Sequence, residues 1–398
     1  MKVKLQTFYS GQGDCIFFSL NEGEESYNIL IDCGKYSGEC RKTIDKYLDS
    51  IGWHINLLIV THIDSDHILG LISLLDKNKE LKIDEIWFNS YKRDSEEEKR
   101  SLTPSERETL KSIYSRLKVA QDIAGDQISA SEAMSLSELI LSKGKEECSQ
   151  GWRWRREYIT SCSDDVSIKG GRFGTITFLT PTEDALKDLE KEFENAFIEG
   201  FYADECPELL EGESVYECLM RMISERDKEL IEEKVSSIES ADRLKEAANA
   251  PVLPVSIHNK ASIAFVYEYN GHRFLFTGDA APEVLCNSLQ AKYKDESPIL
   301  FDFIKVPHHG SAHSMTKELA SLIDSEEYFF TGGQENKRPS AECVGRILHA
   351  DVGGDGKKRK LHFNSMTSFV EELRSSEEIK NLYGVEIDTD CNCYEAEI

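Results

Sequence analysis

The sequence lacks any long apolar run. None of its hydrophobic stretches approaches the ~20 residues that a membrane-spanning helix needs. The opening stretch, MKVKLQTFYSGQGD, has no apolar core of the kind found in a secretory signal. We therefore expect a cytoplasmic protein that makes no use of a membrane.

Paired cysteines of the zinc-binding type are also absent. The chain has 11 cysteines but no CxxC pair, and its closest pair, Cys391 and Cys393, has an uncommon spacing for zinc. We expect buried, reduced thiols rather than a structural zinc site.

Positive charge is scarce, because 47 Lys and Arg face 73 Asp and Glu, for a net charge of -26. Such a field repels nucleic acid at long range, so a polyanionic substrate would need a local basic patch. Two stretches offer one: residues 152–158, WRWRREY, and residues 357–360, KKRK. Trp and Tyr can stack on bases while Arg binds phosphate. The alternative for both stretches is a packed or solvated surface that binds nothing.

The hydrophobic pattern predicts an α/β core interrupted twice. Expected strands lie at 2–8, 15–18, 27–32, 56–61, 81–88, 166–168 and 174–179, with more after 252. Expected helices lie at 39–50, 69–76, 281–293, 315–323, 340–350 and 365–374. The core then comprises 1–90, 164–181 and 251–398. A mostly helical insertion fills 91–163, and an acidic helical insertion fills 182–250; both are candidate surfaces for a protein partner.

Polar residues follow the apolar run 57–60 at once, in the order His62, Asp64, Asp66 and His67. Imidazole and carboxylate ligands suit Zn, Fe or Mn better than Ca. Four donors in six residues do not easily close one tetrahedral site, but they can contribute to two adjacent sites. The alternative is a solvated turn with incidental charges.

Two later strands end in the same way. FLFTGD ends at Asp279, and FIKVPHHGS carries His308 and His309. Asp279 alone could equally be a turn residue or a helix N-cap. Three strand ends that supply His and Asp nevertheless predict a metal centre on a sheet edge.

These motifs resemble the metallo-β-lactamase superfamily, and most closely the soluble hydrolase domain of ComEC-type DNA-uptake proteins, without their membrane channel. The resemblance rests on GQGDCIFF (11–18), ILIDCG (29–34), VTHIDSDHILGL (60–71), TFLTP (177–181), NKASIAF (259–265), FLFTGD (274–279), KVPHHGSAHS (305–314) and GGQENKRPS (332–340). It implies a metallo-β-lactamase αββα sandwich with two divalent ions, Zn or Mn, with Fe as a further option, at one edge.

The resemblance also implies a ligand set. His62 and Asp64 would serve the first metal, Asp66 and His67 the second, and Asp279 both. One histidine of HHGS would complete the second site, with His308 preferred to His309. His258 is either a further ligand or a loop histidine.

Two positions depart from the family pattern. Asp64 stands where most lactamase-fold enzymes have His, which makes Mn or Fe more plausible beside Zn. Arg338 stands where many ComEC-like chains have His, and is either a phosphate clamp or a surface arginine. Asn259, Ser311 and His313 are further candidates for substrate contact.

The expected function is phosphodiester hydrolysis by a hydroxide bound between two metals, as in a nuclease or nucleotide phosphodiesterase. Asp64, Asp66 and His308 are the candidate catalytic residues. A bacterial multi-component system is a reasonable setting. The alternatives are a lactone, ester or thioester hydrolase, and a partner-binding module that retains the metal site.

Overall fold

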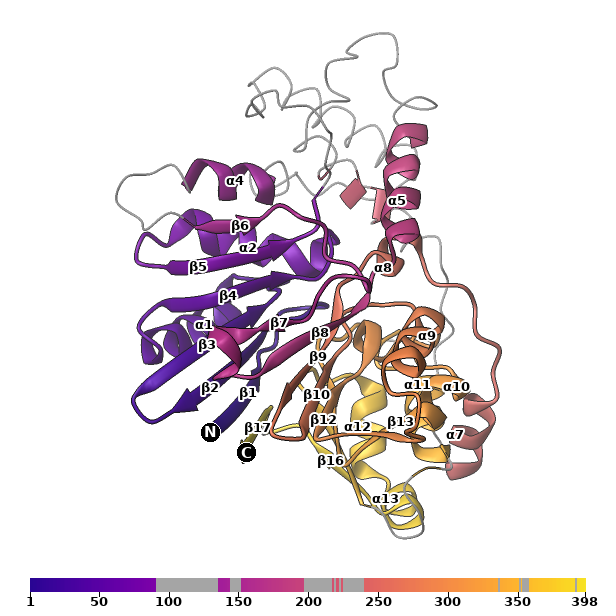
Figure 1. Ribbon diagram of the computed structural model, residues 1–398. Coiled ribbons are helices and arrows are strands. Elements are labelled where there is room, and N and C mark those ends of the chain that lie inside the picture. Colours follow the sequence, from indigo (N-terminus) through magenta and orange to yellow (C-terminus); the bar gives the residue numbers. More distant parts are fainter. Residues whose placement is uncertain are drawn as a thin grey trace.

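Two β-sheets pack face to face and helices cover their outer faces in the computed structural model (Figure 1). The structure describes residues 1–90, 135–143, 152–196, 240–335, 337–350, 352, 358–390 and 392–398. Five positions between 217 and 224 are also described.

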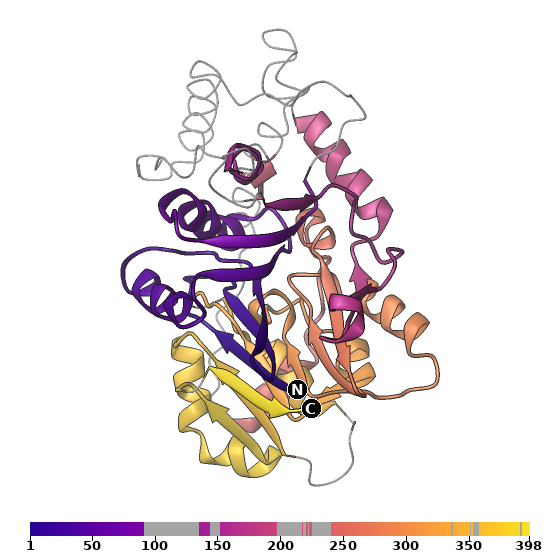
Figure 2. The same cartoon turned by 60° about the vertical axis from the view of Figure 1, so that its left-hand side comes forward.

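The first sheet has the strand order β17-β1-β2-β3-β4-β5-β6. Its strands are β1 (Lys2–Thr7), β2 (Ile16–Glu22), β3 (Glu25–Ile31), β4 (His54–Val60), β5 (Lys82–Phe88), β6 (Arg153–Arg155) and β17 (Cys393–Glu397). The pairs from β17 to β3 are antiparallel, and those from β3 to β6 are parallel. Because β17 pairs with β1, the two ends of the chain lie side by side (Figure 2).

The second sheet has the order β16-β15-β14-β12-β10-β9-β8-β7. Its strands are β7 (Val166–Ser167), β8 (Thr175–Thr180), β9 (Ala264–Tyr269), β10 (His272–Phe276), β12 (Phe303–Lys305), β14 (Glu327–Phe330), β15 (Arg359–Phe363) and β16 (Val385–Asp388). The pairs from β10 to β16 are parallel, so these strands end at one edge. A separate two-stranded sheet joins β11 (Ile299–Phe301) and β13 (Ile323–Ser325).

Helices bury their apolar faces on the outside of each sheet. The first sheet is covered by α1 (Gly38–Ser50), α2 (Ser65–Lys77), α4 (Leu136–Lys143) and α5 (Glu183–Ala196). The second is covered by α7 (Ala241–Ala248), α9 (Pro282–Lys292), α10 (Lys317–Leu322), α11 (Ala341–His349), α12 (Ser368–Ser375) and α13 (Glu377–Tyr383). The short α8 (Ile257–Lys260) and the 3₁₀ segments η1 (Ile168–Gly171) and η4 (Pro307–Gly310) complete the described elements.

A third buried cluster fills the space between the sheets, where inward side chains of both meet. Aromatic rings dominate it. Phe303 is fully buried, and its ring centroid lies 5.0 Å from that of Phe274 and 5.6 Å from that of Phe329. Helix, sheet, sheet and helix therefore form four layers, and the predicted αββα sandwich is confirmed.

The helix after β4 begins at Ser65 rather than at residue 69 as expected. Asp64 has extended backbone and precedes the first turn, and its carbonyl accepts the backbone N–H groups of His67 and Ile68. The helix therefore starts inside the polar motif and holds Asp66 and His67 rigidly in its first turn.

The two insertions lie largely outside the described residues, so their predicted boundaries and their role in binding a partner remain predictions. Residues 153–155, assigned to the first insertion from sequence, form the edge strand β6. Within the ranges that the structure covers, no helix has both the length and the apolarity to cross a membrane.

The inter-sheet core can be tested at Phe303. Phe303→Ala should lower the free energy of unfolding by about 3–5 kcal/mol, because it leaves a cavity among aromatic rings. Leu300→Ala is the matched control, since Leu300 is 55% exposed. Urea unfolding of both variants measures the difference. Equal midpoints for the two would contradict this account of the core.

Candidate metal centre

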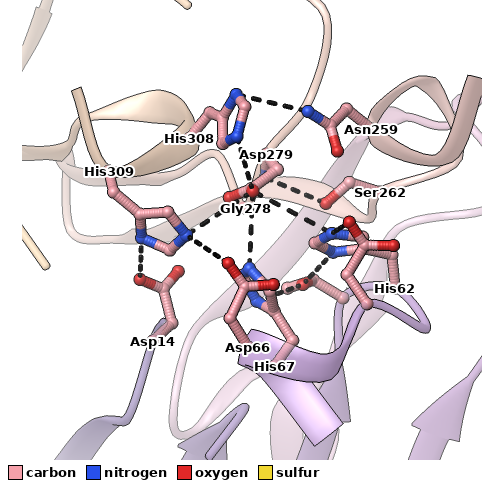
Figure 3. A network of polar contacts seen from close by, with 12 residues as sticks. Asp14, His62, Asp66, His67, Asn259, Ser262, Gly278, Asp279, His308 and His309 are labelled. Atoms are coloured by element: carbon pink, nitrogen blue, oxygen red, sulfur yellow. Dashed lines mark hydrogen bonds and ion pairs between the residues drawn. The ribbon is translucent and has the colours of Figure 1, made fainter. Parts of the chain in front are cut away.

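Five segments bring histidines and carboxylates together at one edge of the sandwich (Figure 3). They are the end of β4, the first turn of α2, α8, the residues after β10 and the turn after β12. These segments contribute His62, Asp64, Asp66, His67, His258, Asn259, Asp279, His308 and His309. The predicted convergence of three strand ends is therefore observed in space.

One oxygen of Asp279 lies at the centre of this cluster. Four imidazole Nε2 atoms surround Asp279 Oδ2: His67 at 3.4 Å, His309 at 3.6 Å, His308 at 3.7 Å and His62 at 3.9 Å. These distances are too long for hydrogen bonds. They do match pairs of ligand atoms that share a cation, because tetrahedral bonds of about 2.1 Å put two ligand atoms about 3.4 Å apart.

The remaining carboxylates divide the cluster into two halves. On one side, Asp64 lies 3.6 Å from His62 Nε2 and 3.5 Å from His258 Nδ1. On the other, Asp66 Oδ2 lies 3.7 Å from His309 Nε2. Asp279 lies between the halves, as expected for a carboxylate that serves two ions.

Burial supports the same interpretation. Nε2 of His62, His67 and His309 and both oxygens of Asp279 are buried, and within the described part of the chain they make no hydrogen bond. Buried polar atoms without partners are rare in native proteins. Their donor chemistry, imidazole nitrogen with carboxylate oxygen, fits a divalent transition-metal ion.

Contacts to Nδ1 of His309 and His67 direct the other ring nitrogen, Nε2, toward the cluster. His309 Nδ1 donates to the Thr331 carbonyl at 2.8 Å, which directs Nε2 toward Asp279. His67 Nδ1 lies 2.8 Å from Asp32 Oδ2. Asp32 is itself held by the N–H of Thr61 at 2.8 Å and its hydroxyl at 2.6 Å. Such contacts orient metal-binding histidines and raise their basicity.

A buried ion pair, Lys305 with Asp14, lies behind His309 and Asp279. Lys305 Nζ lies 2.6 Å from Asp14 Oδ2 and donates to the Gly278 carbonyl at 2.9 Å. Asp14 Oδ1 lies 3.1 Å from His309 Nδ1. Although burial opposes ionisation, Lys305 and His309 hold the pKa of Asp14 below its usual range. Through these contacts, the ion pair of Lys305 and Asp14 links Gly278, the residue before Asp279, to His309.

Opposing effects also set the charges of two central residues. Burial opposes ionisation of Asp279, yet His309, His67 and His308 hold its pKa well below the usual range. Burial opposes protonation of His67, yet Asp279 and Asp32 raise its pKa well above the usual value. A proton on His67 would therefore leave when a cation binds.

The two histidines of the HHGS motif have separate places. His308 and His309 adopt left-handed backbone, with φ of 46° and 54°, and Gly310 follows at 79°. A Cβ at Gly310 would come 2.6 Å from Phe330, so the turn needs glycine there. The turn sends His309 toward Asp14 and His308 toward Asn259 (Figure 3).

This arrangement changes the preference between the two histidines. His309 is fully buried and groups with Asp66 and His67, whereas the side chain of His308 is 17% exposed. His308 Nδ1 lies 3.2 Å from Asn259 Nδ2 and 3.1 Å from Ser311 Oγ. The geometry favours His309, not His308, as the ligand that completes the second half, and leaves His308 at the rim.

The other predicted contact residues differ in position. Arg338 is buried, and its Nη1 lies 3.6 Å from Asp66 Oδ2, so it faces the centre rather than the surface. His313 accepts a hydrogen bond from the N–H of Leu253 at 3.1 Å. The described contact of His313 is thus with a neighbouring loop, outside the cluster.

The two basic stretches are engaged within the protein. Arg153 pairs with Glu85, and Arg155 lies over the ring of Trp87 at 5.8 Å. Lys357 lies outside the described residues, while Arg359 pairs with Asp324 and Lys360 with Asp388. These contacts engage part of each stretch, while the Arg153 side chain remains 73% exposed and Lys358 lies at the surface.

Sequence reasoning assigned no role to Asp14, Asp32 or Lys305. All three stand within the motifs that carry the family resemblance. Each is also a charged residue beside an apolar strand, which is the one feature that could have suggested a buried partner. Their partners are distant in sequence and become visible only in the fold.

No protein-family model matches the chain, and no curated protein matches it either. Among solved structures, the metallo-β-lactamase fold protein YhfI from Bacillus subtilis is 12% identical, with 99% of each chain covered and a TM-score of 0.38. Zn²⁺-bound PqqB from Methylobacterium extorquens is 10% identical, with 100% of each chain covered and a TM-score of 0.37. The assignment of site residues therefore rests on the geometry of this chain, an αββα sandwich with a centre suited to divalent metal.

The role of Asp279 can be tested by metal content. Asp279→Asn should lose most of its bound transition metal, because a neutral amide cannot offset the charge of two neighbouring cations. Asp188→Asn, on the exposed surface of α5, is the matched control. Plasma mass spectrometry of both purified proteins gives the ratio of metal to protein. Full metal content in Asp279→Asn would show that this carboxylate holds no ion.

Metal content and turnover, measured together, should distinguish the roles of His308 and His309. His309→Ala should lose about one of two ions, since it removes a ligand from the Asp66 half. His308→Ala should keep both and instead slow turnover about 100-fold or more, in the range expected for loss of a general acid. The opposite pattern would restore His308 as the ligand.

Proposed function

We propose that this protein is a metal-dependent hydrolase that cleaves phosphodiester bonds. The observation that carries the proposal is the position of Asp279 Oδ2 among four imidazoles, with Asp64 and Asp66 on its two sides. Few structural roles call for so many buried, titratable groups around one oxygen, whereas hydrolytic metal centres use such an arrangement.

The residues divide into two ligand sets. His62, Asp64 and His258 would hold one ion, and Asp66, His67 and His309 the other, with Asp279 shared. When bound, two divalent ions supply an acidified water and neutralise charge that develops on the substrate. The Asp64 carboxylate makes the first set harder, so Mn or Fe would suit it alongside Zn.

The protein's own groups would then orient the substrate and move its proton. Arg338 lies beside Asp66 and carries a fixed positive charge, which suits a non-bridging phosphate oxygen. His308 is the partly exposed imidazole of the cluster, positioned by Asn259 and Ser311. It is placed to give a proton to the departing oxygen of an ester.

Arg338 also favours a phosphodiester over other electrophiles. Its guanidinium is buried, and Nη1 makes no hydrogen bond within the described residues, so an anionic ligand would satisfy it. A neutral lactone, ester or thioester has no comparable group for it. The resemblance to ComEC-type hydrolase domains points in the same direction and names nucleic acid or nucleotides as substrates.

A substrate panel tests the proposal. With Mn²⁺ or Zn²⁺, the protein should hydrolyse bis-p-nitrophenyl phosphate and oligonucleotides, but not nitrocefin or lactones. Asp66→Ala should abolish turnover because it removes a ligand beside Asp279. Arg338→Gln should raise KM for phosphodiesters about tenfold, as expected for the loss of one charged contact. Hydrolysis of lactones or thioesters without phosphodiester turnover, across several metals, would replace this proposal with the alternative.

A further inference from the structure

A cavity of about 990 Å³ opens directly beside the candidate metal centre. Asp66 and Arg338 belong to its wall, so the cavity and the centre share two residues. The wall combines loop residues 9–12 and 34–37 and one face of α2 from one half of the sandwich with residues 333–335, 337 and 338 from the other half.

These loops are held tightly against one another. A Cβ at Gly13 would lie 1.4 Å from the carbonyl oxygen of Asp66, and one at Gly34 would lie 2.0 Å from it. A Cβ at Gly332 would lie 2.3 Å from the carbonyl oxygen of Gln12. The contacts between the glycine loops and the Asp66 turn therefore leave no space for side chains, and the wall has a fixed form.

The charge of the wall is opposite to that of the chain. Lys35, Lys77, Lys337 and Arg338 line the cavity, against two acids, Asp66 and Glu335. In a chain with 73 acidic and 47 basic residues, this concentration of cations is unusual. A concave basic surface next to a hydrolytic centre raises the local concentration of anions.

The acids of the wall are committed elsewhere, and the lysines are not. Both oxygens of Glu335 accept from the backbone N–H of Ser368 at the start of α12, at 3.1 and 3.2 Å. Asp66 faces His309 at 3.7 Å as a candidate ligand. Across the described ranges, no carboxylate lies within ion-pairing distance of Lys35, Lys77 or Lys337. The wall therefore presents net positive charge to any ligand.

An aromatic ring stands on the same wall. The side chain of Tyr9 is 49% exposed, although a ring of this size gains most by burial. An exposed ring among lysines is the combination that binds nucleotides, with the base stacked on the ring and phosphate on the cations.

We propose that this cavity is a binding site for a second nucleotide phosphate, adjacent to the phosphate that undergoes hydrolysis. The proposal rests on the phosphodiesterase function proposed above and extends it. Lys35, Lys77 and Lys337 hold the second phosphate, Tyr9 stacks on its base, and Arg338 lies between this phosphate and the metal centre. The protein then prefers ligands with two or more phosphates, either a nucleic-acid strand or a small nucleotide.

The test measures binding without chemistry, on the full chain as purified. A fluorescent phosphorothioate dT12, which resists hydrolysis, is titrated at several salt concentrations, and anisotropy gives Kd. Lys35→Gln, Lys77→Gln and Lys337→Gln are combined in one variant. Lys245→Gln, Lys292→Gln and Lys294→Gln, all exposed and outside the cavity wall, are combined in the matched control.

The cavity variant should bind dT12 roughly tenfold more weakly at low salt. The slope of log K against log salt should fall in magnitude by about 0.7, because the three lysines hold one phosphate and each phosphate contact on a single strand contributes about 0.7 to the slope. The control should behave as the native protein. Equal Kd and slope in native protein and cavity variant would overturn the proposal.

Tyr9 gives a second measurement that does not depend on charge. Tyr9→Ala should weaken binding about fivefold or more through the loss of stacking, while Tyr9→Phe should retain it. If Tyr9→Phe weakens binding as much as Tyr9→Ala, the stacking role is wrong.

Competition by small nucleotides identifies the source of the second phosphate. If thymidine 3′,5′-bisphosphate displaces dT12 better than thymidine monophosphate, and only while the lysines are present, small nucleotides are ligands. Lysine dependence seen with dT12 alone identifies a strand. Each result supports the site.

The same proteins separate this proposal from the proposed function. Hydrolysis of bis-p-nitrophenyl phosphate together with lysine-independent binding of dT12 would overturn the cavity site and leave the phosphodiesterase standing. Lysine-dependent binding of dT12 with no hydrolysis of any phosphodiester would overturn the phosphodiesterase and leave the cavity as a phosphate-binding site.

Discussion

The arrangement of the whole site depends on one carboxylate oxygen, Asp279 Oδ2, which four imidazoles approach to within 3.9 Å. Burying so many polar atoms costs free energy unless each finds a partner. Among the described residues, the Asp279 oxygens and Nε2 of His62, His67 and His309 make no hydrogen bond, whereas their spacing suits shared cations. The fold therefore holds these groups in an arrangement that metal ions would complete.

Rigid elements on both sheets maintain that arrangement. Asp279 follows β10 in the second sheet, and His62 follows β4 in the first, so the centre spans the two halves of the sandwich. Lys305 and Asp14 link the halves again behind His309. Asp32 contacts Nδ1 of His67 in the same way that Asp14 contacts Nδ1 of His309. A change at any of these three residues would act on metal binding without touching the metal.

Much of the fold, and the meeting of His and Asp side chains at one sheet edge, could be predicted from sequence, because both have local causes. Apolar runs that end in His or Asp mark strand ends at a sheet edge, which is why His62, Asp66, His67 and Asp279 were identified together. The choice between His308 and His309 has no such cause. Neighbouring residues of one type differ here only through two left-handed backbone positions, and sequence patterns do not record those.

The supporting residues and the cavity wall were harder to predict for a different reason. Lys35, Lys77 and Lys337 belong to separate segments, and nothing in their local sequence relates them. In the basic stretch that looked suitable for nucleic acid, residues 152–158, Arg153 pairs with Glu85 and Arg155 lies over the ring of Trp87. The basic surface beside the centre is therefore formed by lysines from separate segments that meet only in the fold. The sequence had instead suggested two continuous basic stretches, 152–158 and 357–360.

Anomalous diffraction from crystals of the protein loaded with Mn²⁺ or Zn²⁺ tests the central claim most directly. The account predicts two peaks about 4 Å apart, on either side of Asp279, one beside His62 and Asp64 and the other beside Asp66, His67 and His309. A single peak that Asp279 does not contact, or no peak in this cluster at all, would contradict it.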